Sequence, residues 1–175
     1  MDAEWYRRAC SGRRMGSPRF GCDDQTRLDS TQWRLARLAA ALESMRREWP
    51  QSAKWPVAFG GFSGGAKRSA LLGAMLAKTG SIKTCRFFLS GINEDRLSEA
   101  YANYHLGRDF LGIPIWLSSG QDDNVATPQD HDRVKSSLER RGFKRVRLER
   151  FAGGHQVKMG EVERALRWFR EVARF

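Results

Sequence analysis

Cysteine is scarce in this chain of 175 residues, and its placement indicates neither a zinc site nor a disulfide framework. The three cysteines, Cys10, Cys22 and Cys85, are an odd number and show no C-x-x-C spacing, which structural zinc sites typically use. Cys10 and Cys22 could form a disulfide if the protein were exported. We expect free thiols instead.

Long apolar runs are also missing. No stretch approaches the roughly 20 apolar residues that a membrane-spanning helix needs, so we predict no membrane span. The first residues, MDAEWYRRAC, carry charge from the second position onward and lack the apolar core of a secretory signal. As written, the chain therefore predicts a cytoplasmic product.

The charge is unbalanced, with 31 basic and 20 acidic residues and a formal net charge of +11. Most of the excess lies in residues 131 to 175, which carry 13 basic and 6 acidic side chains. There the two signs are mixed, and no helix-turn-helix, zinc-finger or RNA-binding signature accompanies them. We read this region as a solvated, arginine-rich face and predict no nucleic-acid partner.

Apolar patterning predicts strands that alternate with helices from residue 29 onward. Three short apolar runs end in glycine or polar residues, and a fourth segment places Val146 and Leu148 on one face, whereas the segments between them repeat apolar residues every three or four positions. The predicted strands are VAFGG, TCRFFLSG, IPIWLSSG and KRVRLERF. This alternation predicts an α/β fold with a mostly parallel sheet covered by helices on both faces. Residues 1–28 form a poorly defined segment, with one strand expected near residues 19–22, and residues 29–175 form one domain.

A glycine-rich turn follows the first predicted strand. Residues 61–65 read GFSGG and fit the pattern G-x-S-x-G. This pattern suits a nucleophilic serine on a tight strand-to-helix turn, because glycines keep side chains away from the crowded backbone. Ser63 could equally belong to a plain glycine turn, but the apolar strand before it and the alanine-rich helix after it favour a nucleophile.

Two further candidate residues follow later strands. Asp122 and Asp123 come after the third strand, and His155 comes after the fourth. Because the carboxyl ends of parallel strands meet at one edge of a sheet, we expect Ser63, an aspartate and His155 to converge there. Histidine can accept the serine proton, and a buried carboxylate can orient the imidazole. Separately, Asp123 could shape a turn and His155 could cap the last helix.

These motifs together resemble the α/β-hydrolase superfamily, in particular its small esterase and depolymerase-like members. GGFSGGA resembles the nucleophile elbow, GQDDNVATP the acid loop G-x-x-D-x-x-x-x-P, and GGH the histidine loop. The resemblance spans about residues 30 to 175 and selects Asp123 over Asp122. It implies that Ser63 attacks an ester carbonyl, that His155 is the general base and acid, and that Asp123 orients His155. It also implies that the backbone N–H of Gly64 supplies half of the oxyanion hole.

The chain departs from that family in its N-terminal part. The family's second oxyanion donor follows an earlier strand, usually marked by His-Gly, and no such motif is present. We read the chain as the C-terminal half of the fold and expect a truncated reading frame or a late start codon. The first strand would then be an exposed edge, so the isolated product should be poorly soluble or oligomeric. A missing upstream segment could also have held a signal for secretion.

The sequence thus predicts a serine hydrolase that cleaves small carboxylic esters through an acyl-enzyme, with no metal and no other cofactor. The alternative is an α/β-hydrolase-like protein that is catalytically weak or inactive. Tyr101 and Tyr104 could line a substrate pocket, although a surface helix and turn is the favoured interpretation of residues 92–112. His131 is expected to be solvated and receives no role. The acyl and alcohol groups and the oligomeric state are not encoded in any motif.

Overall fold

The computed structural model describes residues 31–82 and 85–172 and divides into two compact units between Trp55 and Pro56. In the first unit, α3 (Thr31–Glu48) is the predicted amphipathic helix and buries Leu35 and Leu42 on one side. It is followed by the short 3-10 helix η1 (Pro50–Lys54). The predicted boundary at residue 29 and the strand expected near residues 19–22 lie outside the described residues.

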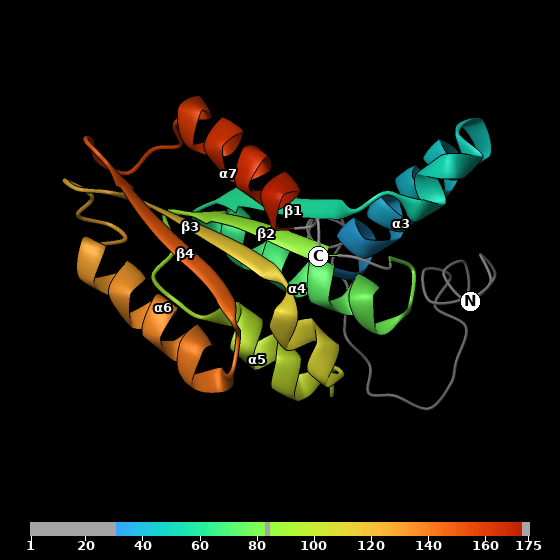
Figure 1. The fold of residues 1–175 in the computed structure, drawn as a ribbon, viewed down its shortest axis with the longest axis horizontal. Helices are drawn as coiled ribbons and strands as arrows, with labels where there is room; N and C mark the ends of the chain where they lie inside the picture. Colours follow the sequence, from blue (N-terminus) through green and yellow to red (C-terminus); the bar gives the residue numbers. More distant parts are fainter. Residues whose placement is uncertain (1–30, 83–84, 173–175) are drawn as a thin grey trace, which may run out of the picture. The chain divides into compact units, whose positions relative to one another are not determined.

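The second unit is built on a sheet of four parallel strands in the order β1-β2-β3-β4 (Figure 1). These strands are β1 (Val57–Phe62), β2 (Cys85–Ser90), β3 (Pro114–Gly120) and β4 (Arg145–Phe151). All four coincide with the predicted strands. Their parallel direction brings their carboxyl ends, and the loops that follow them, to the same edge of the sheet.

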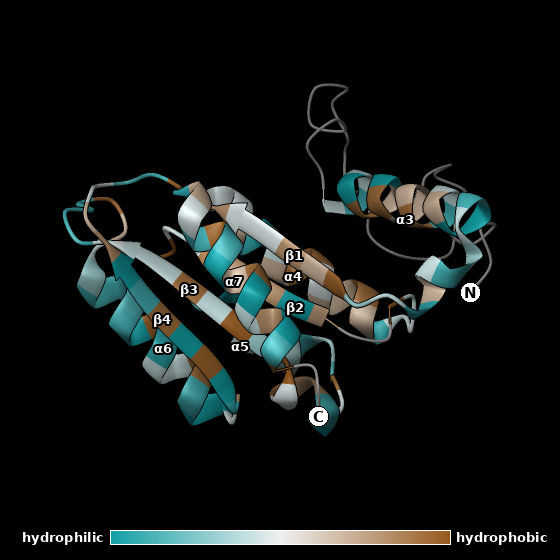
Figure 2. Cartoon of the chain, turned by 45° about the horizontal axis from the view of Figure 1, so that its top comes forward, coloured by the Kyte–Doolittle hydropathy of each residue, from teal (hydrophilic) through white to brown (hydrophobic). Residues whose placement is uncertain are grey.

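Helices cover both faces of this sheet, as the alternation of strands and helices predicted (Figure 1). On one face lie α4 (Gly64–Lys78), α5 (Arg96–Asn103) and α6 (Pro128–Arg141), and on the other lies α7 (Met159–Glu171). Strand β2 is buried along its whole length because both faces are covered. In β4, hydrophilic and hydrophobic residues alternate (Figure 2), which is typical of a strand with one exposed face.

Both ends of helix α6 have well-defined caps. The side chain of Thr127 accepts a hydrogen bond from the backbone N–H of Asp130, and the Asp130 carboxylate accepts one from the N–H of Thr127. This capping box fixes the N-terminus of the helix. At the other end Gly142 adopts a left-handed conformation, with φ 105°. The box also holds the end of the loop that carries Asp123.

One apolar residue of α7 does not face the sheet. Leu166 stands at helical spacing from Val162 and Phe169 but is 45% exposed. The helix packs instead through Ala165 and Phe169, which form a buried cluster with Phe88 of β2 and Trp116 of β3. Small Ala165 allows close approach of the helix to these large rings, so the packing face is rotated away from Leu166.

A membrane-crossing helix is not found among residues 31–82 and 85–172, since none of their helices combines sufficient length with sufficient apolar character.

Candidate functional site

Ser63 occupies the sharp turn between β1 and α4, in a strained backbone conformation. Its φ is 53° and its ψ is −124°, a combination that L-residues rarely adopt and that costs of order 1–3 kcal/mol. Apart from Ser63, His105 is the one non-glycine residue of the described part with positive φ. Such strain at a non-glycine residue indicates that the position needs a side chain.

The first glycine of the motif is required by close packing of the turn. A Cβ atom on Gly61 would lie 2.5 Å from the carbonyl oxygen of Gly65 and 2.6 Å from the backbone nitrogen of Ala66. Both are backbone atoms, so no side-chain movement could relieve the clash. A Cβ on Gly64 or Gly65 would meet nothing within 4 Å. Gly61 therefore permits the close approach of strand and helix that forms this turn.

The hydroxyl of Ser63 is not used to hold the helix. Ser63 is the N-cap residue of α4, yet its side chain makes no capping hydrogen bond. Its backbone N–H donates to the carbonyl of Ser90 (2.8 Å), and its carbonyl accepts from Ala66 N–H (3.0 Å). The N–H of Gly64 is the first of α4, where amide groups lack helical acceptors and favour negative charge.

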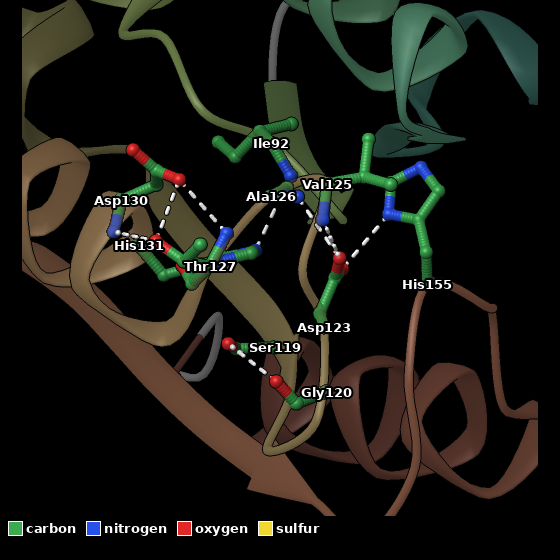
Figure 3. Close-up of polar contacts among 10 residues, drawn as sticks. All are labelled: Ile92, Ser119, Gly120, Asp123, Val125, Ala126, Thr127, Asp130, His131 and His155. Atoms are coloured by element: carbon green, nitrogen blue, oxygen red, sulfur yellow. Dashed lines mark hydrogen bonds and ion pairs between the residues drawn. The ribbon is translucent and has the colours of Figure 1, made fainter.

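Asp123 and His155 meet at the same edge of the sheet (Figure 3). Nδ1 of His155 lies 2.8 Å from Oδ2 of Asp123, and since a carboxylate oxygen can only accept, Nδ1 carries the proton. The other carboxylate oxygen accepts hydrogen bonds from the N–H groups of Val125 (2.8 Å) and Ala126 (2.9 Å). Asp123 is thus fixed, and Nε2 of His155 is left to accept a proton.

Burial and hydrogen bonds act in opposite directions on the Asp123 carboxyl group. Its side chain is 1% exposed, and this burial raises its pKa, but the bonds from His155, Ala126 and Val125 outweigh burial and hold the pKa below its usual range. The resulting stabilisation is therefore present above about pH 4 and is lost as the pH falls further. At neutral pH Asp123 is charged.

Asp122 differs from Asp123 in exposure and in its hydrogen bonds. It is exposed, whereas Asp123 is buried. Its backbone N–H donates to the carbonyl of Gly153 (3.0 Å), so Asp122 ties the acid loop to the histidine loop through its main chain. In the described structure, the carboxylate that reaches His155 is that of Asp123.

Phe62 and Gly91 link Ser63 to His155. The ring of Phe62, the residue before Ser63, lies 4.5 Å from the His155 ring between centroids. A Cβ on Gly91 would lie 2.7 Å from the Phe62 ring and 3.1 Å from Cε1 of His155. The two candidate residues are therefore near neighbours. No hydrogen bond joins them within the described residues.

The structure does not bring Tyr101 to this edge. Its ring packs at 6.4 Å from Phe110 and 6.0 Å from Phe143, residues that shortly precede β3 and β4 at the amino ends of the strands. Tyr104 is the C-cap residue of α5. Burial, and to a smaller extent the charge of Glu99, raises the pKa of its hydroxyl group. A substrate role for the two tyrosines stays a prediction that these contacts do not support.

The expectation that His131 is solvated is wrong, because its side chain is fully buried. Burial lowers its pKa and favours the neutral imidazole. The sequence does contain a signal for this: His131 stands three residues before Val134 and seven before Leu138, so all three share the buried face of α6. The polar residues on either side of it, in QDHDRV, favour a solvated position instead.

A metal centre is not suggested by the described residues, which contain no group of three or more His, Cys, Asp or Glu side chains able to hold an ion. Cys85, at the opposite end of β2 from Ser90, is a buried free thiol whose pKa is raised by burial.

Gly120, at the end of β3, allows the loop that carries His155 to pack closely against the end of this strand. A Cβ there would overlap the carbonyl oxygens of Gly153 and Gly154. Gly120→Ala should lower the free energy of unfolding by ~1–3 kcal/mol, because the two loops must shift to admit the methyl group. Thermal melts measure this effect. Gly160→Ala, in helix α7 with open space around its Cβ, is the control and should not lower the stability, since alanine favours a helix more than glycine does.

Comparison with solved structures places this architecture among known folds. Zea mays acyl-protein thioesterase 2 matches with 16% identity and a TM-score of 0.54, covering 90% of this chain and 70% of that one. Arabidopsis thaliana SOBER1 matches with 16% identity and a TM-score of 0.55, covering 92% and 70%. A Pyrococcus furiosus esterase matches with 14% identity and a TM-score of 0.54, covering 86% and 63%. Neither a family model nor a curated protein sequence matches the chain. At these identities the shared property is the fold, which is of the α/β-hydrolase type.

Proposed function

We propose that this chain is a serine hydrolase that cleaves small carboxylic esters through an acyl-enzyme on Ser63. The observation that carries the proposal is the strained conformation of Ser63 (φ 53°) at a strand-to-helix turn, with its hydroxyl unused by the helix cap. The Asp123–His155 pair, with its 2.8 Å hydrogen bond at the same sheet edge, supplies the base that such a serine needs.

In the first half of the reaction, Oγ of Ser63 attacks the ester carbonyl while Nε2 of His155 takes the hydroxyl proton. The carbonyl π electrons move onto oxygen, and the tetrahedral intermediate then expels the alcohol, which receives the proton from His155. In the second half, water loses a proton to Nε2 and attacks the acyl-enzyme, and Ser63 regains its proton as the acid leaves. Asp123 keeps the imidazole in the required tautomer throughout.

The oxyanion that forms in both halves would lie before the N-terminus of α4. Gly64 N–H is the donor that we propose, because it belongs to the first residue of that helix and follows the nucleophile directly. A Cβ at Gly64 would meet no atom within 4 Å, so no neighbouring side chain fills the space beside it. No cofactor enters this mechanism.

One observation favours the alternative, a catalytically weak or inactive hydrolase-like protein. Within the described residues β1 pairs with β2 alone, and a second oxyanion donor from a strand on its other side is not among them. Loss of one such donor costs about 10²- to 10³-fold in kcat. A chain of this kind would acylate slowly yet keep Ser63 as its reactive residue.

Hydrolysis of p-nitrophenyl acetate and butyrate by the purified chain tests the proposal. Turnover should be accompanied by an acetyl or butyryl adduct on Ser63, detected by mass spectrometry after rapid acid quenching. An adduct that forms without turnover would favour the weakly active alternative. Turnover that persists with the adduct on another residue would contradict the proposal.

A further inference from the structure

We propose that His131 is a positioning residue for the ester hydrolysis proposed above. Its two ring nitrogens form hydrogen bonds to two segments. One is residues 90–92, the end of β2 and the turn after it, and the other is the loop that carries Asp123. His131 would touch neither substrate nor the reacting atoms. It acts through the backbone of this turn, which lies between Ser63 and His155. The inference rests on the proposed function of Ser63.

The hydrogen bonds of His131 define a bridge between two segments (Figure 3). Its Nε2 accepts from the backbone N–H of Ile92 at 3.2 Å. Because Nε2 is an acceptor, the proton of the neutral ring must reside on Nδ1, which donates to the carbonyl of Thr127 at 3.0 Å. Ile92 is the second residue after β2, and Thr127 closes the acid loop, so one imidazole bonds to both segments.

The turn held by this bridge contacts each part of the proposed catalytic site. The carbonyl of Ser90 accepts from the N–H of Ser63 (2.8 Å). Gly91, with φ 60°, lies against the rings of Phe62 and His155. The N–H of Gly91 donates to the carbonyl of Ser118 in β3 (3.1 Å). A shift of this short segment would therefore move Ser63 relative to the Asp123–His155 pair.

The chemistry of the bridge requires a neutral ring. A second proton on Nε2 would face the N–H of Ile92, placing two donors against each other. Burial lowers the pKa of His131, although the backbone of Thr127 and the charges of Asp123 and Asp130 act in the opposite direction. These two carboxylates are the groups whose charges act on the ring. Since the folded pKa is depressed, the stabilisation is complete above about pH 6.5 and declines as the pH falls below that value.

Two amide substitutions distinguish the hydrogen bond of His131 to Ile92 from its hydrogen bond to Thr127. In His131→Gln the amide oxygen can reach the position of Nε2 and accept from Ile92, while Thr127 keeps the backbone hydrogen bond from residue 131. In His131→Asn the amide nitrogen can replace Nδ1, but Ile92 N–H loses its acceptor. A buried unpaired N–H costs about 1–3 kcal/mol, enough to displace the turn.

We expect His131→Asn to lower kcat for p-nitrophenyl butyrate by about 10²-fold, with KM nearly unchanged, because a displacement of about 1 Å at the reacting atoms has that cost. His131→Gln should retain most of the wild-type kcat. Hydrogen exchange of the Ile92 amide gives a readout independent of turnover: it should be slow in the wild type and His131→Gln and fast in His131→Asn.

Val134→Ala is the matched control, because Val134 is buried one turn further along α6 and makes no part of the bridge. It should lower the melting temperature while keeping kcat. If the wild type turns over and His131→Asn loses stability but matches His131→Gln in kcat, the positioning role is refuted and the proposed function stands. A wild type that neither turns over nor acylates Ser63 overturns the proposed function, and this inference with it.

Discussion

Ser63→Ala is expected to abolish ester hydrolysis, lowering kcat by ~10⁴-fold or more, as loss of a catalytic nucleophile typically does. The fold should survive, because alanine is as small as serine and the hydroxyl makes no capping bond in α4. Steady-state hydrolysis and circular dichroism check the two statements. Activity of Ser63→Ala near that of the wild type would exclude Ser63 as the nucleophile.

Ser63→Gly is the companion variant, because it separates strain from chemistry. Glycine adopts φ 53° without the penalty of about 1–3 kcal/mol that a side chain incurs. The variant should therefore be inactive yet more stable than both the wild type and Ser63→Ala. If thermal melts show no gain in stability, the backbone of Ser63 is not held under strain and the elbow interpretation is weakened.

Asp123→Asn is expected to lower kcat by about 10⁴-fold while leaving the position of the loop unchanged, the effect of presenting His155 with an amide that favours the wrong tautomer. The amide oxygen can still accept from Val125 and Ala126, and its NH₂ would then face Nδ1 of His155. The rates of hydrolysis of p-nitrophenyl acetate and butyrate measure the loss of kcat.

Asp122→Asn is the matched control, one residue away in the same loop. Asp122 is exposed and contributes its backbone N–H rather than its carboxylate to the loop contacts. The variant should keep wild-type kcat. If Asp122→Asn were the more damaging of the two, the carboxylate assignment made from the 2.8 Å hydrogen bond would be wrong.

The layered fold was predictable because its signals are local. Apolar runs ending at Gly61 and Ser90 mark the carboxyl ends of β1 and β2, and the cap formed by Thr127 and Asp130 marks the start of α6. Parallel topology then places the loops after β1, β3 and β4 at one edge. The meeting of Asp123 with His155 follows from that topology, since 32 residues separate them in the chain.

Other features depend on packing that single-residue patterns do not specify. Leu166 repeats at helical spacing but is exposed, because Ala165 brings α7 closest to Trp116. Tyr101 was named as a possible pocket residue from its position in the chain, with a surface helix and turn favoured, and its ring packs against those of Phe110 and Phe143. For His131 the spacing from Val134 and Leu138 indicates burial, but its hydrogen bond with Ile92, 39 residues away in the chain, is set by packing.

A serine-directed fluorophosphonate probe distinguishes a nucleophilic Ser63 activated by His155 from a serine in a plain glycine turn. The purified chain and His155→Ala are treated with the probe, and the adduct is mapped by mass spectrometry after both proteins are shown to be folded. We expect an adduct on Ser63 in the wild type that is lost in His155→Ala. A folded wild type without an adduct on Ser63, or equal labelling of both proteins, would contradict this expectation.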